Sequence, residues 1–261
     1  MNAAADILQM SRDVLWINFV VFLRVGPVMS LFPGFGERSV PVRIKLLLAV
    51  MFTVIVAPAV APAVAPNFAD ISREPPPLAW IIVSETAVGL LIGIGLRLFL
   101  LALQTAGSIA AQATSLAQIL GSAGVTPLPA IGHLLVVGGL ALAMILGLHV
   151  RVAEMVVLTY NLFPVAQLPE ASAVTTWGIR QVAASFALAF TLAAPFVIVS
   201  VLYNLTLGII NRAMPQLMVV FVGAPVITAG GMTLLLLLAP TMLTIWYEAL
   251  EAFVINPFGG N

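Results

Sequence analysis

The sequence predicts an all-α integral membrane protein, and its composition and long apolar stretches carry that prediction. Of its 261 residues, 62% are hydrophobic and 8% are charged, whereas a soluble domain averages about 45–50% apolar and roughly 25% charged residues. A soluble fold of this size could not hide so much apolar surface, because even large domains leave much of their area in water. Most of this surface must therefore face lipid or other apolar protein.

Six stretches are apolar enough to be membrane-spanning helices, since a span takes about 20 apolar residues. They are Val14–Leu31, Ile44–Ala65, Leu78–Leu103, Ala130–Leu148, Val182–Ile210 and Met218–Leu243. A mixed segment, Arg151–Gln181, separates the fourth stretch from the fifth. The pattern predicts a multi-pass protein without a long soluble loop.

Small residues recur at helical spacing inside these stretches, at Gly89 and Gly93 and again at Gly139, Ala143 and Gly147. This spacing lets helix backbones approach closely. Several prolines also fall inside the stretches or near their ends, where they kink helices. Ordinary membrane-helix composition explains these features equally well, but together they favour kinked helices packed mainly on protein.

Three ionisable residues, Arg24, Glu85 and Arg97, lie within apolar stretches. A charge at the centre of a span costs about 2.5–3.5 kcal/mol on translocon scales, so each should face protein, a cavity or another charge. Glu85 and Arg97 are too far apart to pair within one helix, at about 18 Å along the axis. A proton or ion relay is one explanation. Pairing between subunits is favoured, because no second carboxylate or histidine shares a helical face with them.

Signals for catalysis are absent from the sequence. It contains no GxxxxGK[ST], HExxH or GxSxG pattern, no cysteine, and two histidines, His133 and His149, that are far apart. There is also no basic stripe of the kind that binds nucleic acid. We therefore expect a protein that is not an enzyme, with no catalytic residue, metal ligand or cofactor.

The connector Gln104–Pro129 carries no charge and is rich in Ala, Gly, Ser, Thr and Gln. It is too polar to face lipid, yet a solvated loop usually carries charge. Irregular backbone at membrane depth is tolerated inside a protein assembly or beside a water-filled passage. The connector fits such a place, although a plain interhelical linker remains the alternative.

Two motifs resemble those of the FliR family of type III export proteins. The more specific is the pattern NLxLGxxNRxxPQ, followed by a Gly-x-Pro, and the second, Glu37–Leu46, lies in the first loop. Their residues, for which the resemblance implies subunit packing, are Asn204, Gly208, Asn211, Arg212, Pro215, Gln216, Gly223 and Pro225, with Arg38, Pro41, Arg43 and Lys45 in the first loop. The equivalent subunit of virulence injectisomes is similar in layout and is the close relative.

This resemblance implies a structural pore or gate subunit of the flagellar export apparatus, required for export of flagellar proteins and for flagellum assembly. Residues 1–181 would be FliP-like and would include a pore loop at about 104–129, and residues 182–261 would form a FliQ-like helical hairpin. The implied partners are FliP-type and FliQ-type subunits, a FliB/FlhB-type gate protein and unfolded exported proteins in transit. The implied location is the bacterial inner membrane, at the flagellar basal body.

The resemblance also implies that the loop between two central helices plugs the pore. The residues that map to this plug are Gln112, Leu116, Gln118, Ile119, Leu120, Gly121 and Gly124. An uncharged loop can close a lumen by packing and dewetting, and glycines would let it fold aside.

A small-solute secondary transporter is the alternative from another functional class. The charges in apolar stretches and the Pro- and Gly-broken helices are typical of transporters, which often also contain internal repeats. We see no convincing repeat between the two halves of this sequence.

Overall fold

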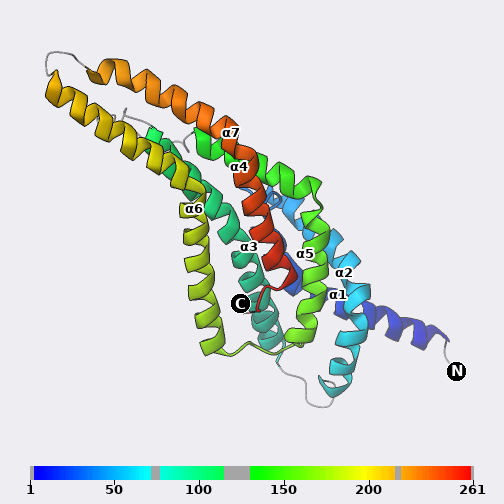
Figure 1. Ribbon diagram of the computed structural model, residues 1–261. Coiled ribbons are helices and arrows are strands. Elements are labelled where there is room, and N and C mark those ends of the chain that lie inside the picture. Colours follow the sequence, from blue (N-terminus) through cyan, green and yellow to red (C-terminus); the bar gives the residue numbers. More distant parts are fainter. Residues whose placement is uncertain (1–2, 72–76, 115–129, 215–218, 260–261) are drawn as a thin grey trace. The chain divides into compact units, whose positions relative to one another are not determined.

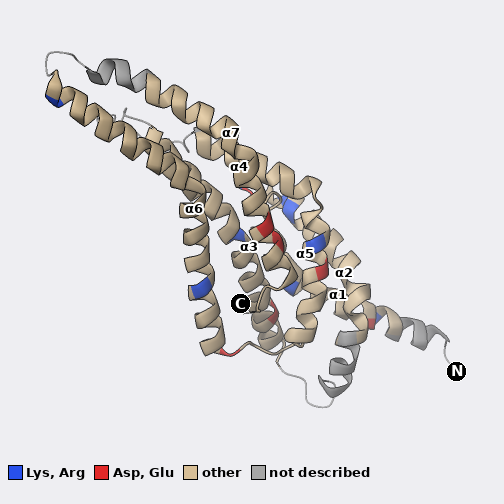
Figure 2. Cartoon of the chain, in the orientation of Figure 1, with Lys and Arg blue, Asp and Glu red and all other residues tan. Residues whose placement is uncertain are grey.

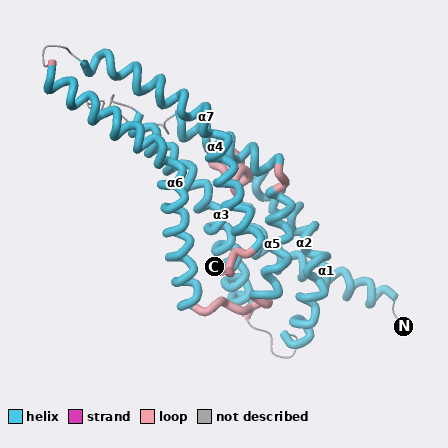
Figure 3. Tube along the Cα trace, viewed as in Figure 1, coloured by secondary structure: helices cyan, strands magenta, loops and turns pink. Residues whose placement is uncertain are grey.

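The computed structural model describes residues 3–71, 77–114, 130–214 and 219–259, and there the chain forms seven α-helices (Figure 1). They are α1 (Ala3–Leu31), α2 (Val42–Ile71), α3 (Leu78–Thr114), α4 (Ala130–Ile145), α5 (Leu148–Leu162), α6 (Ala171–Ala213) and α7 (Val219–Ile255). Within these ranges there is no strand (Figure 3). The prediction of an all-α fold is confirmed.

The helices are long and apolar enough for a membrane protein. Among the described residues, α1, α2, α3, α6 and α7 each contain a candidate span, and α4 with α5 makes a sixth if that broken pair is counted as one. Long parts of α6 and α7 carry no charge at all, over residues 181–211 and 219–247 (Figure 2). Since charges are expensive within a bilayer, such runs suit an apolar surrounding. The chain is a multi-pass membrane protein.

Helix α5 is the main departure from the sequence prediction, which treated this part of the chain as a mixed segment. The helix is amphipathic. Val152 and Val156 are buried, whereas Arg151 and Glu154 are exposed and form an i, i+3 ion pair at 3.6 Å. A search for continuous apolar runs misses such a helix, because only one of its faces is apolar.

Gly147 lies in the turn between α4 and α5 and is the N-cap residue of α5. Its φ is 80°, in the left-handed region, which glycine adopts without the steric cost that a Cβ brings. No atom lies within 4 Å of the place where a Cβ would stand. Gly147 thus makes a turn, and the prediction that it extends a packing face with Gly139 and Ala143 is wrong for this residue.

The polar connector predicted from Gln104 begins as helix rather than as loop, because α3 continues to Thr114. The hydroxyls of Ser108 and Thr114 donate to the carbonyls of Gln104 and Ala110, at 2.8 and 3.0 Å. Hydroxyls bonded in this way to the preceding turn are satisfied within their own helix. A polar sequence can therefore prolong an apolar span. The rest of the connector, residues 115–129, lies outside the described residues.

The chain packs as two compact units, each built from segments that are distant in sequence. The first comprises Met1–Arg97, Leu146–Ile179 and Glu251–Asn261, and the second comprises Leu98–Ile145 and Arg180–Leu250. The division at residue 181 into FliP-like and FliQ-like parts concerns likeness to partner subunits. It stays a prediction.

In the first unit, α1 packs on α2 and α2 packs on α5. The core includes Val20, Val21, Val25, Val56, Val60, Val88, Ile92 and Leu96. Gly89 and Gly93 of α3 lie against α1, since a Cβ on Gly89 would overlap the carbonyl oxygen of Arg24 and one on Gly93 would press on Leu31. The close approach predicted for these two glycines is confirmed.

In the second unit, the later part of α3 contacts α6 and α7 through polar groups bonded to its carbonyls. The indole Nε1 of Trp246 donates to the Phe99 carbonyl at 2.8 Å, and the Ser185 hydroxyl donates to the Leu98 carbonyl at 2.9 Å. Trp246 is fully buried. A buried indole usually needs such a partner, so these bonds fix where the helices meet.

Helices α3 and α4 approach closely at Gly107 and Gly132. A Cβ added to Gly107 would overlap the Cα of Gly132, so the two backbones touch without intervening side chains. Gly→Ala substitutions at exposed helical glycines are usually favourable, because glycine weakens a helix by roughly 0.5–1 kcal/mol relative to alanine. At Gly107 the steric overlap should outweigh that gain.

We expect Gly107→Ala to destabilise the protein by about 1–3 kcal/mol, the usual cost of overpacking. Gly230→Ala is the matched control, since Gly230 is also helical, lies in the same unit and has open space around it. Thermal unfolding of the detergent-solubilised protein measures both variants. An unchanged Tm for Gly107→Ala would contradict the close contact.

Candidate functional site

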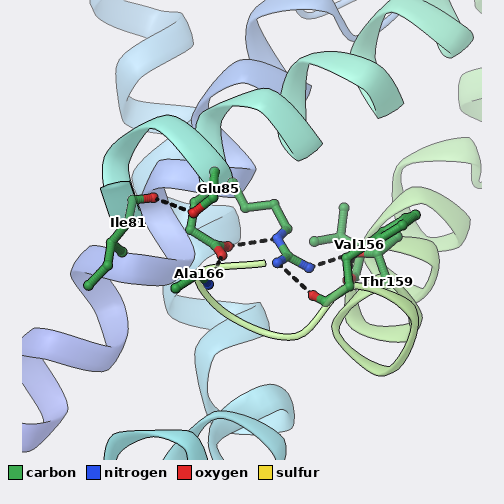
Figure 4. A network of polar contacts seen from close by, with 8 residues as sticks. Ile81, Glu85, Val156, Thr159 and Ala166 are labelled. Atoms are coloured by element: carbon green, nitrogen blue, oxygen red, sulfur yellow. Dashed lines mark hydrogen bonds and ion pairs between the residues drawn. The ribbon is translucent and has the colours of Figure 1, made fainter. Parts of the chain in front are cut away.

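The candidate site is a polar network buried in the first unit and centred on Arg24 of α1 (Figure 4). The Nε of Arg24 donates to Oε2 of Glu85 on α3 at 2.8 Å, and both side chains are 0% exposed. Removing two charges from water costs several kcal/mol per ion, which their attraction offsets only where the remaining donors and acceptors are also satisfied. The neighbours of the pair therefore matter as much as the pair itself.

The other two guanidinium nitrogens of Arg24 are bonded to α5 and to the loop that follows it. Nη1 donates to the Thr159 hydroxyl at 3.3 Å, and Nη2 donates to the Phe163 carbonyl at 2.9 Å. The guanidinium carbon lies 3.7 Å from the centre of the Tyr160 ring, a cation–π contact that gains strength when water is excluded. Arg24 thus joins α1, α3, α5 and the loop after α5.

Glu85 uses its second oxygen to hold the same loop. The backbone N–H of Ala166 donates to Oε1 of Glu85 at 3.2 Å, and the indole of Trp80 donates to the Ala166 carbonyl at 2.9 Å. Glu85 and Trp80 lie on α3. Figure 4 shows Glu85, Thr159 and Ala166 converging from three segments of the chain. The peptide groups of Ala166 are therefore fixed from both sides.

Ala166 has a backbone conformation that few non-glycine residues adopt, with φ at 64°. The left-handed region costs of order 1–3 kcal/mol for such a residue and persists only where surrounding contacts over-determine it. The bonds from Glu85 and Trp80 are such contacts. The buried ion pair consequently sets the path of the loop between α5 and α6.

The last described residues of the chain close over this loop. The indole of Trp177 donates to the Pro257 carbonyl at 2.7 Å. The ring of Phe258 meets the Phe163 ring edge-on at 4.9 Å and lies 5.5 Å from the Trp177 ring. The carbonyl of Phe163 is the one that accepts from Arg24. The C-terminal residues of the described chain thus join Arg24 of α1 in one network within the first unit.

Arg97 belongs to a second ion pair, nearer the surface of the first unit. It binds Glu37 in the loop between α1 and α2, and the two side chains are 24% and 22% exposed. Lys45 donates to the Gly36 carbonyl in the same loop at 2.8 Å. Two residues of the predicted first-loop region, Glu37 and Lys45, therefore fold that loop, whereas Arg38 and Arg43 are exposed.

Each of the three predicted buried charges has a partner inside the chain, in contrast to the predicted pairing between subunits. The relay explanation also lacks support at Arg24, because a guanidinium has donors but no acceptor and cannot pass a proton onward. Within the described part of the chain, no group of three or more His, Cys, Asp or Glu residues could hold a metal ion. The network can fix a loop, and nothing in it points to a reaction.

The more specific family motif lies on the last turns of α6, and its described residues face outward. Asn204, Gly208, Asn211 and Arg212 are all exposed. Asn204 donates only within its helix, to Ser200, and no atom lies within 4 Å of a Cβ built on Gly208. The described chain itself gives these residues no packing role.

Most of the other predicted residues lie outside the part of the chain that the structure describes. Pro215 and Gln216 lie outside the described residues, and Gly223 and Pro225 lie in α7 without described side chains. Of the predicted plug, Gln112 is exposed on the last turn of α3. The remaining plug residues, Leu116, Gln118, Ile119, Leu120, Gly121 and Gly124, lie outside the described residues.

Sequence reasoning missed most partners of the buried charges. The sequence analysis did not predict the partners on α5 and in the loop after it, namely Thr159, Tyr160 and Phe163, because α5 itself was not predicted. Glu37 was visible in the first-loop motif, but nothing in the sequence shows that a residue 60 positions away from Arg97 is its neighbour. A usable signal was present all the same, since a cation in an apolar span needs an anion from some other element.

Comparison with known proteins gives consistent results over nearly the whole chain. The family described as bacterial export proteins, family 1, matches residues 15–253. The chain is 32% identical over 250 residues to the flagellar biosynthetic protein FliR of Caulobacter vibrioides, covering 95% of this chain and 96% of the relative. It is 28% identical over 229 residues to FliR of Escherichia coli, covering 86% and 85%. The chain belongs to the FliR family of bacterial export proteins.

Proposed function

We propose that this chain is a structural pore and gate subunit of the flagellar type III export apparatus, needed for export of flagellar proteins and for flagellum assembly. The observation that carries the proposal is the family match over residues 15–253, together with relatives named as flagellar biosynthetic proteins. Those names favour the flagellar apparatus over a virulence injectisome. In this role the chain sits in the bacterial inner membrane at the flagellar basal body.

The proposed partners are FliP-type and FliQ-type subunits, with a FliB/FlhB-type gate protein beside them. The exposed motif on α6 supports an interface of this kind. Glycine in a helix costs roughly 0.5–1 kcal/mol relative to alanine, and the described chain makes no use of the space at Gly208. A helix from another subunit can approach closely at such a residue. Exposed Leu205 and Ile209 beside it supply apolar surface for that contact.

The role of the buried network in this proposal is positional. Arg24 and Glu85 hold the loop after α5, and their bonds leave no reacting group for an enzymatic step. The alternative of a small-solute transporter loses its main support, because the charges that suggested it are paired inside the chain. A subunit that lines a passage for unfolded protein needs shape and surface rather than chemistry.

The pore plug remains part of the proposal, on the strength of the resemblance and of the uncharged sequence at residues 104–129. A conduit for unfolded chains must not leak ions. An uncharged segment with a few large apolar residues can exclude water from a narrow lumen.

Co-expression tests the partner assignment. Affinity purification of this chain in mild detergent should recover FliP-type and FliQ-type subunits, and native mass measurement should give their copy numbers. In the same assay, Gly208→Leu should reduce recovery of partners about fivefold or more, since overpacking costs about 1–3 kcal/mol and 1.4 kcal/mol is about tenfold in affinity. Leucine is a better helix former than glycine, so α6 itself should not weaken.

Gly178→Leu is the matched control for Gly208→Leu, because Gly178 also lies in α6 with no atom within 4 Å of a Cβ. Normal partner recovery with Gly208→Leu would rule out the α6 motif as the interface. Failure of the unmodified chain to recover either partner would contradict the proposed function itself.

The buried ion pair gives a test that separates positioning from proton relay. Glu85→Ala should destabilise the chain by about 3–5 kcal/mol, because it leaves Arg24 buried and unpaired. The double variant Arg24→Met/Glu85→Leu should recover only part of that loss, because it removes the unpaired charge but leaves the Phe163 carbonyl and the Ala166 amide without their partners. Yield of the assembled complex and swimming motility are the readouts. A double variant that assembles normally but exports nothing would favour a relay over the positional role.

Deleting Gly121–Gly124 should raise the ion permeability of membranes that hold the complex, because the shortened segment can no longer fill the lumen. Assembly with partners should be retained. Proton or potassium flux into vesicles containing the purified complex measures the effect. Permeability equal to that of the unmodified complex would count against the plug.

A further inference from the structure

An apolar groove of about 700 Å³ runs between α1 and α2 in the first unit. Its residues are Val14, Leu15, Ile17, Asn18, Phe19 and Phe22 on α1, and Val50, Thr53, Val54, Ala57, Pro58 and Ala61 on α2. Two phenylalanine rings on one helix face small residues on the other. The two helices pack on each other, so the groove exists because these small side chains leave space beside the rings.

The groove offers few hydrogen-bonding groups to an occupant. Its two side chains with polar groups, Asn18 and Thr53, donate within their own helices to the carbonyls of Val14 and Ala49, at 2.8 and 2.7 Å. A polar ligand would therefore lose hydrogen bonds to water without gaining replacements, which is costly in an apolar site. The lining fits a hydrocarbon chain.

The groove is formed by two helices that are apolar enough to cross a membrane. They contain the candidate spans Met10–Leu31 and Val42–Pro62. Leu15 and Val54, which line the groove from opposite sides, are 71% and 60% exposed. Burying such side chains is worth about 25 cal/mol per Å² of apolar surface. An acyl chain laid along the groove would supply that burial.

One end of the groove carries a positive charge on the same helical stripe. Arg12, Leu15 and Phe19 are spaced i, i+3 and i+7, so they share one face of α1. Arg12 is exposed, and no hydrogen bond or ion pair holds it among the side chains that the structure describes. Asp13 belongs to the next stripe, which runs through Trp16 to the buried Val20. The stripe along the groove thus begins with a cation and continues as hydrocarbon.

Trp16 lies one turn after Arg12 and suits a membrane surface. Its ring stacks on Phe19, a groove residue, at 5.6 Å. Tryptophan is enriched where the headgroups meet the hydrocarbon, because its ring is largely apolar and its N–H is polar. A membrane surface at the level of Trp16 would bring Arg12 to the depth of lipid phosphates.

We propose that this groove binds a phospholipid, with one acyl chain along α1 and α2 and the lipid phosphate paired with Arg12. The charge at the mouth decides between a lipid and a partner helix. An apolar helix would fill the groove but would leave Arg12 without a counter-charge, whereas a phospholipid matches both the apolar length and the cationic end. The site goes beyond the proposed export role, which needs no bound lipid.

Photolabelling tests this site on the complex isolated through its partner subunits. The complex is placed in nanodiscs that contain phosphatidylglycerol with a diazirine in one acyl chain, irradiated, digested and mapped by mass spectrometry. Label should concentrate on residues 14–22 and 50–61. Val54→Trp, which fills the groove from an exposed position, should lose that label. Val137→Trp is the matched control, since Val137 is 51% exposed on α4 and does not line the groove.

Arg12→Gln should also lower labelling of the groove by phosphatidylglycerol, whereas Arg180→Gln, at another exposed arginine, should leave it unchanged. Equal labelling of the groove in Val54→Trp and the unmodified complex would overturn the site. So would a benzoylphenylalanine placed at Leu15 that crosslinks to a partner chain, because the groove would then be a protein interface. If the unmodified chain forms no complex, that result contradicts the proposed function. If the unmodified complex forms but its groove takes up no label, that result contradicts the lipid site alone.

Discussion

The fold of the first unit depends on one buried ion pair. Arg24 and Glu85 are fully shielded from solvent, and charges so placed are tolerated only when every neighbour supplies a matching group. Helix α5 and the loop after it meet that demand through the Thr159 hydroxyl, the Phe163 carbonyl and the Ala166 amide. Displacing either segment would remove hydrogen bonds from a buried charge, so the pair fixes where both segments lie.

The network also explains how a loop can hold an unfavourable backbone in an otherwise helical protein. Ala166 adopts a left-handed conformation, and its amide and carbonyl are both bonded to side chains of α3. Phe258, near the end of the chain, packs on Phe163 of the same loop. Segments that are distant in sequence therefore depend on one another, which is why the first unit contains both the beginning and the end of the chain.

Outside this unit the chain is apolar and widely exposed. Parts of α6 and α7 are free of charge for about thirty residues, the length of a long membrane-spanning helix, and many of their large side chains are exposed. The chain itself does not cover this surface, so lipid and partner helices must. The family's function, on the proposal made above, resides in such surfaces rather than in a reacting group.

Composition and hydropathy alone determined that this is a helical membrane protein, because lipid demands long apolar helices whatever their packing. Six of the seven described helices coincide with predicted stretches, and the motifs on α6 and in the first loop pointed to the family. Only tertiary structure decided α5, since polar residues interrupt its sequence and its buried face shows only against α2. Tertiary structure also determined the partners of Arg24, Glu85 and Arg97, because each ion pair joins residues about 60 positions apart in the sequence. The sequence predicts that these buried charges need partners, because an unpaired charge is costly in an apolar span. The packing of distant helices determines which residues those partners are.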